Sequence, residues 1–131
     1  MRRETHQRLD PRLTGTPVEL GEGFAVIDLE ASGEMVADDS GLVHGGFVFG
    51  LADHAAMLAI NHPHVVLAGA EVRFLAPVVV GDALRATARV AETEGRKTLV
   101  EVAVTASDRV VFTGRFTCAT PERHVLSGWS S

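Results

Sequence analysis

The chain has 131 residues, 46% of them hydrophobic and 22% charged, a mixture that suits one folded domain and excludes a disordered chain. Lys and Arg total 12 against 17 for Asp and Glu, and the formal net charge of −5 argues against nucleic acid as a partner. Cys118 is the single cysteine, so no intrachain disulfide can form, and no apolar export segment follows the basic N-terminus. We therefore expect a protein of the reducing cytoplasm.

The first part of the chain predicts an arm and one strand. Residues 1–17 mix Arg, Thr, Gly and two prolines without a stable period, which indicates an N-terminal arm with little chemistry. Apolar side chains alternate over residues 24–29 and predict the first strand. Ser32, Gly33 and residues 38–41 interrupt that pattern, so a long loop follows the strand.

A central helix is predicted next. Gly45 and Gly46 open it, and it ends near Asn61 because Pro63 disfavours helical backbone at the residue before it. Its apolar stretch, residues 47–60, is shorter than the roughly 17 to 25 residues that cross a bilayer, so no membrane span is expected. A helix that is apolar nearly all round must be buried, and the rest of the chain has to wrap it.

Four further strands are predicted in residues 65–75, 83–90, 98–106 and 110–119, which are rich in β-branched side chains. Turn signals at residues 77–82, 92–96 and 107–109 separate them, and such short links favour antiparallel neighbours. The sequence thus predicts an α+β domain over residues 18–120, with an antiparallel sheet of about five strands around one long helix. Residues 121–131 are expected to form a C-terminal tail.

One segment carries two chemical signals. The glycines after His44 leave backbone N–H groups unobstructed at a helix start, where they can bind a carbonyl oxygen or an anion. Asp53 lies inside the apolar helix, and burying an unpaired carboxylate costs several kcal/mol. The structural alternatives are close packing at Gly45 and Gly46, and an Asp53 side chain paired with backbone or a basic neighbour.

This segment resembles the hotdog-fold acyl-CoA thioesterases, in particular the phenylacetate-pathway branch, whose signature is G-x-x-H-G-G with Asp nine residues after the His. Gly41, His44, Gly45, Gly46 and Asp53 match it position by position. The resemblance covers roughly residues 18–120, and the run from residue 71 to 82 is similar to the family's R-F-x-x-P-x-x-x-G-D strand and turn.

The resemblance implies hydrolysis of an acyl-CoA or related thioester without a separate cofactor, coenzyme A being part of the substrate. It places the thioester carbonyl on the amides near Gly46 and makes Asp53 the nucleophile or the general base. His44 is then expected to orient the loop or to assist departure of the thiolate. The acyl group itself is not predicted.

Two positions differ from the family pattern. The family commonly has Asn where this chain has Asp38, whose charge would repel Asp53 if the two approached each other. The family often places Ser or Thr on the strand after the helix, where this chain has Leu67, Ala68 and Gly69. The first difference predicts an altered or lost role for position 38, and the second predicts slow or absent hydrolysis.

Spacing along the helix predicts an oligomer. Gly46 and Asp53 are seven residues apart, or about 10 Å along a helix, whereas a base must come within about 3 to 3.5 Å of its target. Asp53 is therefore expected to serve the helix start of a neighbouring chain, with two helices antiparallel. We expect a homodimer or a dimer of dimers.

Three basic residues, three histidines and the cysteine are further candidates for chemistry. Arg96 and Lys97, in a predicted turn, and Arg73 are candidates for contact with the phosphates of coenzyme A, the alternative for the turn being a solvated hairpin end. His54, His62 and His64 match no standard zinc spacing, so no metal is expected. Cys118 is interpreted as a small buried hydrophobe and not as a nucleophile.

Two alternatives to the thioesterase remain open. Residues 96–104 and 110–116 also resemble the effector domain of the bacterial malonyl-CoA-responsive lipid regulators, which favours a non-catalytic acyl-CoA-binding protein with a regulatory role. No helix-turn-helix pattern precedes residue 18, so direct DNA binding is not expected. The second alternative, a dehydratase of the same fold, depends on His54 next to Asp53.

Overall fold

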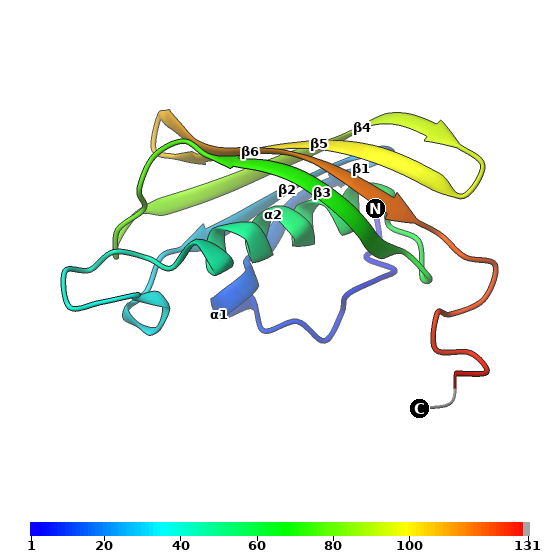
Figure 1. The fold of residues 1–131 in the computed structure, drawn as a ribbon, viewed down its shortest axis with the longest axis horizontal. Helices are drawn as coiled ribbons and strands as arrows, with labels where there is room; N and C mark the ends of the chain where they lie inside the picture. The colour runs from blue at the N-terminus through cyan, green and yellow to red at the C-terminus, as the bar shows by residue number, and fades with distance from the viewer. Residues whose placement is uncertain (130–131) are drawn as a thin grey trace.

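A computed structural model describes residues 1–129, which form two layers, one helix packed under one curved sheet (Figure 1). The sheet curls over α2 (Gly45–Ile60), which contacts all six strands and packs most extensively against β2, β4 and β5. The strands are β1 (Thr16–Gly21), β2 (Phe24–Glu30), β3 (Val66–Phe74), β4 (Ala83–Glu94), β5 (Lys97–Ala106) and β6 (Arg109–Ala119). Two short helical turns, α1 (Pro11–Thr14) and η1 (Gly33–Met35), flank β1 and β2. The predicted α+β architecture is confirmed.

All strand pairs in the sheet are antiparallel, in the order β1-β2-β4-β5-β6-β3. The sheet has six strands, and the expectation of about five was wrong by one edge strand. β1 was missed because its side chains do not alternate between buried and exposed and because Pro17 lies within it. β3, which follows α2 in the chain, is the opposite edge of the sheet, so its outer backbone groups are available to another strand.

α2 is buried because the sheet covers most of its circumference. Nine of its side chains are buried, from Val48 to Ala59, and among them only His54 is polar. The helix ends at Asn61, whose left-handed backbone (φ 53°) lets its N–H donate to the Met57 carbonyl. None of the helices in residues 1–129 is long and apolar enough to cross a membrane.

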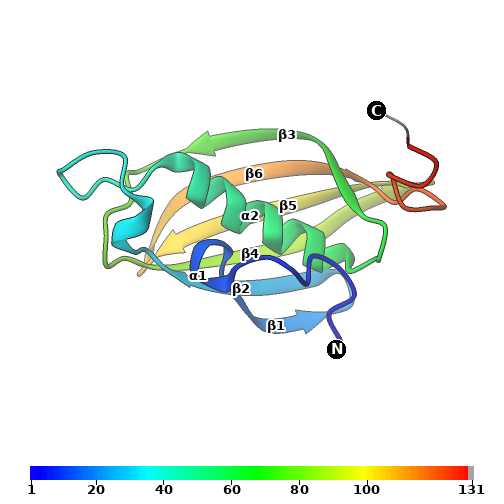
Figure 2. The same cartoon turned by 90° about the horizontal axis from the view of Figure 1, so that it is seen from below.

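The N-terminal arm crosses α2 on the side away from the sheet, as Figure 2 shows from below. Within the arm, α1 begins at Pro11 after Asp10, whose carboxylate accepts a hydrogen bond from the Arg12 N–H at 3.0 Å. Gly15 then turns the chain into β1 with a φ of 95°. A Cβ there would lie 2.9 Å from Leu51 Cδ1 of α2 and 2.7 Å from Ile27 Cγ2 of β2. The arm therefore approaches the core as closely as a glycine allows.

Candidate active site

The turn that leads into α2 is held by backbone hydrogen bonds. The N–H of His44 donates to the Met35 carbonyl at 2.8 Å, and the N–H of Val43 donates to the Val78 carbonyl at 2.8 Å. His44 is the N-cap, and its side chain makes no capping hydrogen bond. Because the first N–H groups of a helix have no acceptor within it, those of Gly45 and Gly46 remain available to a ligand.

Both glycines also satisfy packing requirements. A Cβ on Gly45 would lie 3.2 Å from Cε1 of Phe74, and a Cβ on Gly46 would lie 3.0 Å from Cδ2 and Nε2 of His44. The imidazole of His44 thus lies against the bare backbone of Gly46. Close packing and an open anion site are therefore compatible here, since the same missing side chains permit both.

Asp53 lies in the third turn of α2 and is half-buried. Its Oδ1 atom is inaccessible to solvent and has no hydrogen-bond partner among residues 1–129. Burial raises the pKa of Asp53 to about 6. The carboxylate therefore titrates close to neutrality, which suits a general base, and no basic side chain pairs with it within the described chain.

Asp53 lines a pocket of about 410 Å³ that contains residues sequence reasoning missed. The arm contributes Glu4, Thr5, His6 and Gln7 to the wall, although residues 1–17 were expected to carry little chemistry. The sequence held one signal, the Asp10–Pro11 helix start, which shows that the arm folds. Nothing in the local pattern indicated where it docks.

Within one chain the helix start and Asp53 lie in separate hollows. Gly45 lines an apolar hollow of about 370 Å³ together with Val43, Val48 and the segment from Phe74 to Val78. Asp53 belongs to the other pocket, which includes neither glycine. This agrees with the separation of about 10 Å along the helix between Gly46 and Asp53.

Asp38 lies in the exposed loop between η1 and α2. Its carboxylate accepts a hydrogen bond from the Ser40 N–H at 2.9 Å and another from the Ser40 hydroxyl, which lower its pKa. It lines neither of the two hollows. Leu67, on β3, lines the Asp53 pocket where the family pattern often has a hydroxyl side chain, and Ala68 and Gly69 do not line it.

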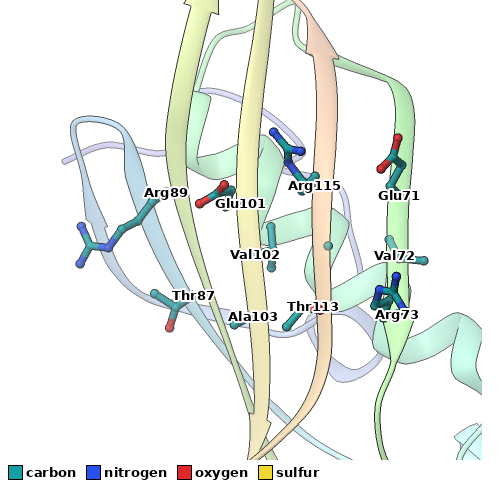
Figure 3. A pocket seen from close by; sticks show the side chains of 11 residues that line it. Glu71, Val72, Arg73, Thr87, Arg89, Glu101, Val102, Ala103, Thr113 and Arg115 are labelled. Atoms are coloured by element: carbon teal, nitrogen blue, oxygen red, sulfur yellow. The ribbon is translucent and has the colours of Figure 1, made fainter.

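The three basic candidates lie in two different places. Arg73 lies on the face of the sheet turned away from α2, beside a hollow of about 840 Å³ that Arg89 and Arg115 also line (Figure 3). Arg96 and Lys97 lie at the β4–β5 hairpin, where Arg96 donates to the Thr120 carbonyl at 3.4 Å. Arg73 pairs across the sheet with Thr113, far from this hairpin, so the three side chains do not form one cluster.

Both ring nitrogens of the buried His54 are occupied. Nδ1 lies 2.8 Å from the Thr14 carbonyl, and Nε2 lies 3.1 Å from Nη2 of Arg3. Its side chain serves as an anchor for the arm, which removes the feature on which the dehydratase alternative depends. Cys118 is fully buried, and burial raises its pKa to about 12, as expected for a packing residue.

Comparison with known proteins identifies the family. The model of the thioesterase superfamily matches residues 40–113, more than half of the chain, so this protein belongs to the thioesterase superfamily. The resemblance inferred from the His44–Gly46 turn and Asp53 is thereby confirmed at the level of the family.

Two curated relatives are much longer than this chain. A methylthioribose-1-phosphate isomerase of Aquifex aeolicus is 51% identical over 112 residues, which cover 86% of this chain and 25% of that protein. Transcription factor FapR of Thermoanaerobacter sp. is 32% identical over 79% of this chain and 55% of its own length. The chain thus spans about a quarter of the first relative and about half of the second.

Solved structures of similar length share the fold. An uncharacterised protein of Pyrococcus horikoshii is 51% identical with a TM-score of 0.95, covering 96% of this chain and 97% of that chain. The PaaI protein of the phenylacetic acid degradation operon of Escherichia coli is 26% identical with a TM-score of 0.78, covering 86% and 83%. The predicted hotdog fold is confirmed.

Proposed function

We propose that this protein hydrolyses an acyl-CoA or related thioester to the free acid and the thiol. The observation that carries the proposal is Asp53, a half-buried carboxylate with an unpaired oxygen, on the helix whose start presents two glycine amides. Membership of the thioesterase superfamily supports this reaction class. Cys118, the single cysteine, is buried with a raised pKa and therefore does not serve as the nucleophile.

The proposed chemistry divides between two places on α2, the glycines at its start and Asp53 in its third turn. The N–H groups of Gly45 and Gly46, at the positive end of the helix dipole, stabilise the oxyanion that forms when the thioester carbonyl is attacked. Asp53 acts as general base on the attacking water, a role that suits a carboxyl with a pKa near 6. His44, packed on Gly46, holds the turn and lies beside the departing thiolate.

The site we propose is completed by a second copy of the chain. Gly45 lines one hollow and Asp53 another, and Gly46 is about 10 Å from Asp53 along the helix, so an antiparallel neighbour must bring its own Gly46 to Asp53. Phe74 and Leu75, at the end of the edge strand β3, are 54% and 53% exposed, and a partner would cover them. Gly46, Gly50 and Asp53 lie on one face of α2, because residues three and four apart in a helix are neighbours. A Cβ at Gly50 would have no atom within 4 Å, which leaves room for a neighbouring helix.

The test is release of free thiol from a panel of aliphatic and aryl CoA thioesters by the purified protein. We expect turnover by the wild type and a loss of at least about 100-fold in Asp53→Asn, because the general base is removed. Arg8→Ala, a change at an exposed residue that lines neither hollow, is the control and is expected to retain activity. Activity that survives in Asp53→Asn would overturn the role of Asp53.

A second candidate is binding of an acyl-CoA without hydrolysis. It is favoured by the FapR relative, a transcription factor that is 32% identical over most of this chain. Asp38 and the segment Leu67–Gly69, where the family pattern has Asn and a hydroxyl side chain, also favour it. Calorimetric binding of CoA thioesters with no thiol release after prolonged incubation would support this candidate over the enzyme.

A further inference from the structure

The N-terminal arm forms one wall of the Asp53 pocket. Four consecutive arm residues line it together with Asp53 and Met57 of α2, and the other lining residues are Pro63, Val65, Val66, Leu67 and His124. Because the lining residues from β3 are apolar, the arm supplies most of the polar groups that line the pocket with Asp53. The pocket is thus apolar on the strand side and polar on the arm side.

The arm is anchored to α2 and its C-terminal end by several contacts. Thr5 is buried, and Nη2 of Arg3 lies 3.1 Å from Nε2 of the buried His54. The Asn61 side chain binds the arm twice, accepting from the Glu4 N–H at 2.7 Å and donating to the Arg2 carbonyl at 2.7 Å. A segment held at its backbone and through Arg3 on the buried His54 keeps its side chains in fixed positions.

His6 is the arm residue with chemical capacity. It adopts a left-handed backbone (φ 54°), which non-glycine residues seldom do and which is often found at functional sites. Its Nδ1 lies 2.8 Å from the Thr5 hydroxyl oxygen, so Nε2 is the nitrogen left for the pocket. Burial, and then the positive charge of Arg3, lower the pKa of His6, which keeps the ring neutral near pH 7.

We propose that His6 is a positioning residue for the water that Asp53 activates, in the place left by the missing hydroxyl side chain at residues 67–69. The proposal rests on the proposed function. His6 donates from Nδ1 to the Thr5 hydroxyl, and its Nε2 accepts a hydrogen bond from one O–H of the water. The other O–H faces the Asp53 carboxylate at the oxygen that is not the solvent-inaccessible Oδ1.

The reaction step balances without any further reactant. The water oxygen bonds to the thioester carbonyl carbon while its proton passes to Asp53. The C–S bond then breaks, and the departing thiolate takes the proton from Asp53, which restores the carboxylate. His6 exchanges no proton, so it must remain neutral. Burial and Arg3 lower its pKa, and the other titratable groups around it are Glu4 on the arm, Asp53 and His54 on α2, and His124 on the tail.

The first test needs no turnover. The imidazole resonances of His6 and the exposed His62 are titrated by NMR in the wild type and in Asp53→Asn. We expect the His6 titration curve to change, because ionisation of Asp53 affects a ring in the same pocket, and the His62 curve to stay the same. A His6 curve that is identical in both proteins would overturn the proposal.

The second test compares steady-state kinetics of His6→Ala and His6→Gln with Arg8→Ala, a change at an exposed arm residue that does not line the pocket. We expect kcat to fall about 10- to 100-fold in His6→Ala with KM within about threefold, and partial recovery in His6→Gln, whose amide can still bind water. Thermal unfolding reports whether the arm has detached, which Asn61→Ala would also cause without changing His6.

The outcomes separate the two proposals. Wild-type kcat in both His6 variants, with Asp53→Asn inactive, would overturn the role of His6 and leave the thioesterase proposal intact. Absence of thiol release by the wild type would overturn the proposed function, and with it the water-positioning role, whatever the NMR titration shows about the shared pocket.

Discussion

Nδ1 of His54 donates a hydrogen bond to the backbone carbonyl of Thr14 across 2.8 Å, joining the middle of α2 to the end of α1. Nε2 of the same ring accepts from Arg3, so one buried side chain holds two points of the arm. His54, next to the proposed general base in the sequence, therefore has a structural role. The arm that it holds forms part of the Asp53 pocket.

Replacing His54 should loosen the arm. We expect His54→Ala to lower the free energy of unfolding by about 2 kcal/mol or more, because it removes two hydrogen bonds and leaves a buried gap. Urea unfolding measures this, with His62→Ala, a change at an exposed residue, as the control expected to stay near the wild type. Equal stability of the two variants would contradict the anchoring role.

The same side chain should make stability depend on pH. The pKa of His54 is lowered, first by burial, so its neutral form contributes stability above its ordinary pKa near 6.5. That contribution is lost as the pH falls through the lowered pKa, because the unfolded chain binds a proton that the folded ring resists. The wild type should therefore lose more stability than His54→Gln between pH 7.5 and pH 5.

Asp53 should cost stability when it is ionised. Burial raises the pKa of Asp53 to about 6. The loss of stability on ionisation therefore begins as the pH rises above the ordinary carboxyl pKa and is complete above about pH 6. We expect Asp53→Asn to be more stable than the wild type by about 1 to 2 kcal/mol at pH 7.5 and equal to it near pH 3.5. Glu71→Gln, which neutralises an exposed carboxylate, is the matched control. An Asp53→Asn protein less stable than the wild type at pH 7.5 would contradict the claim that the ionised Asp53 destabilises the fold.

The pH dependence of hydrolysis follows from the same group. A general base must be ionised, so kcat/KM should rise with pH and level off above the Asp53 pKa near 6. The profile is measured with a substrate that does not titrate in this range. An activity that falls as the pH rises from 5 to 7 would show that the protonated carboxyl is the active form.

Gly50 reports on the surface that the proposed partner covers. A side chain there meets no atom within 4 Å in one chain, so Gly50→Leu should leave the fold intact, and helix propensity should stabilise it. If the α2 of a second chain packs on this face of the helix, the same change weakens the affinity of the dimer by at least about tenfold. Gly33→Leu, at another glycine with open space but outside α2, is the control, and sedimentation velocity measures both.

The sequence predicted the inner strands and α2 well because their patterns are local. Alternation over β2 and β5 and the glycine and proline signals around α2 arise within a few residues of each element. β1 could not be predicted from such signals, since its only strand partner is β2 and its side chains show no alternation. Pairing along an edge is a tertiary property.

The candidate site was predictable in part for the same reason. His44, Gly45, Gly46 and Asp53 belong to one continuous motif, so their spacing could be read directly. Thr5 and His6 reach the pocket only because the arm docks on His54 and Asn61, about fifty residues later in the chain. The sequence alone left His54 open as a catalytic group. Its contacts with the Thr14 carbonyl and with Arg3 show that it anchors the arm.

The central claim is that each site combines Asp53 of one chain with the helix start of another, and subunit complementation tests it most directly. Asp53→Ala and Gly46→Phe should each be inactive, the second because a phenyl side chain at Gly46 displaces His44, whose imidazole would lie 3.0 Å from its Cβ, and covers the helix start. After exchange in equal amounts, about half of the dimers are mixed and each holds one intact site, so activity should recover to about a quarter of the wild-type value. Two inactive parents that exchange subunits fully and still show no activity would contradict the shared site.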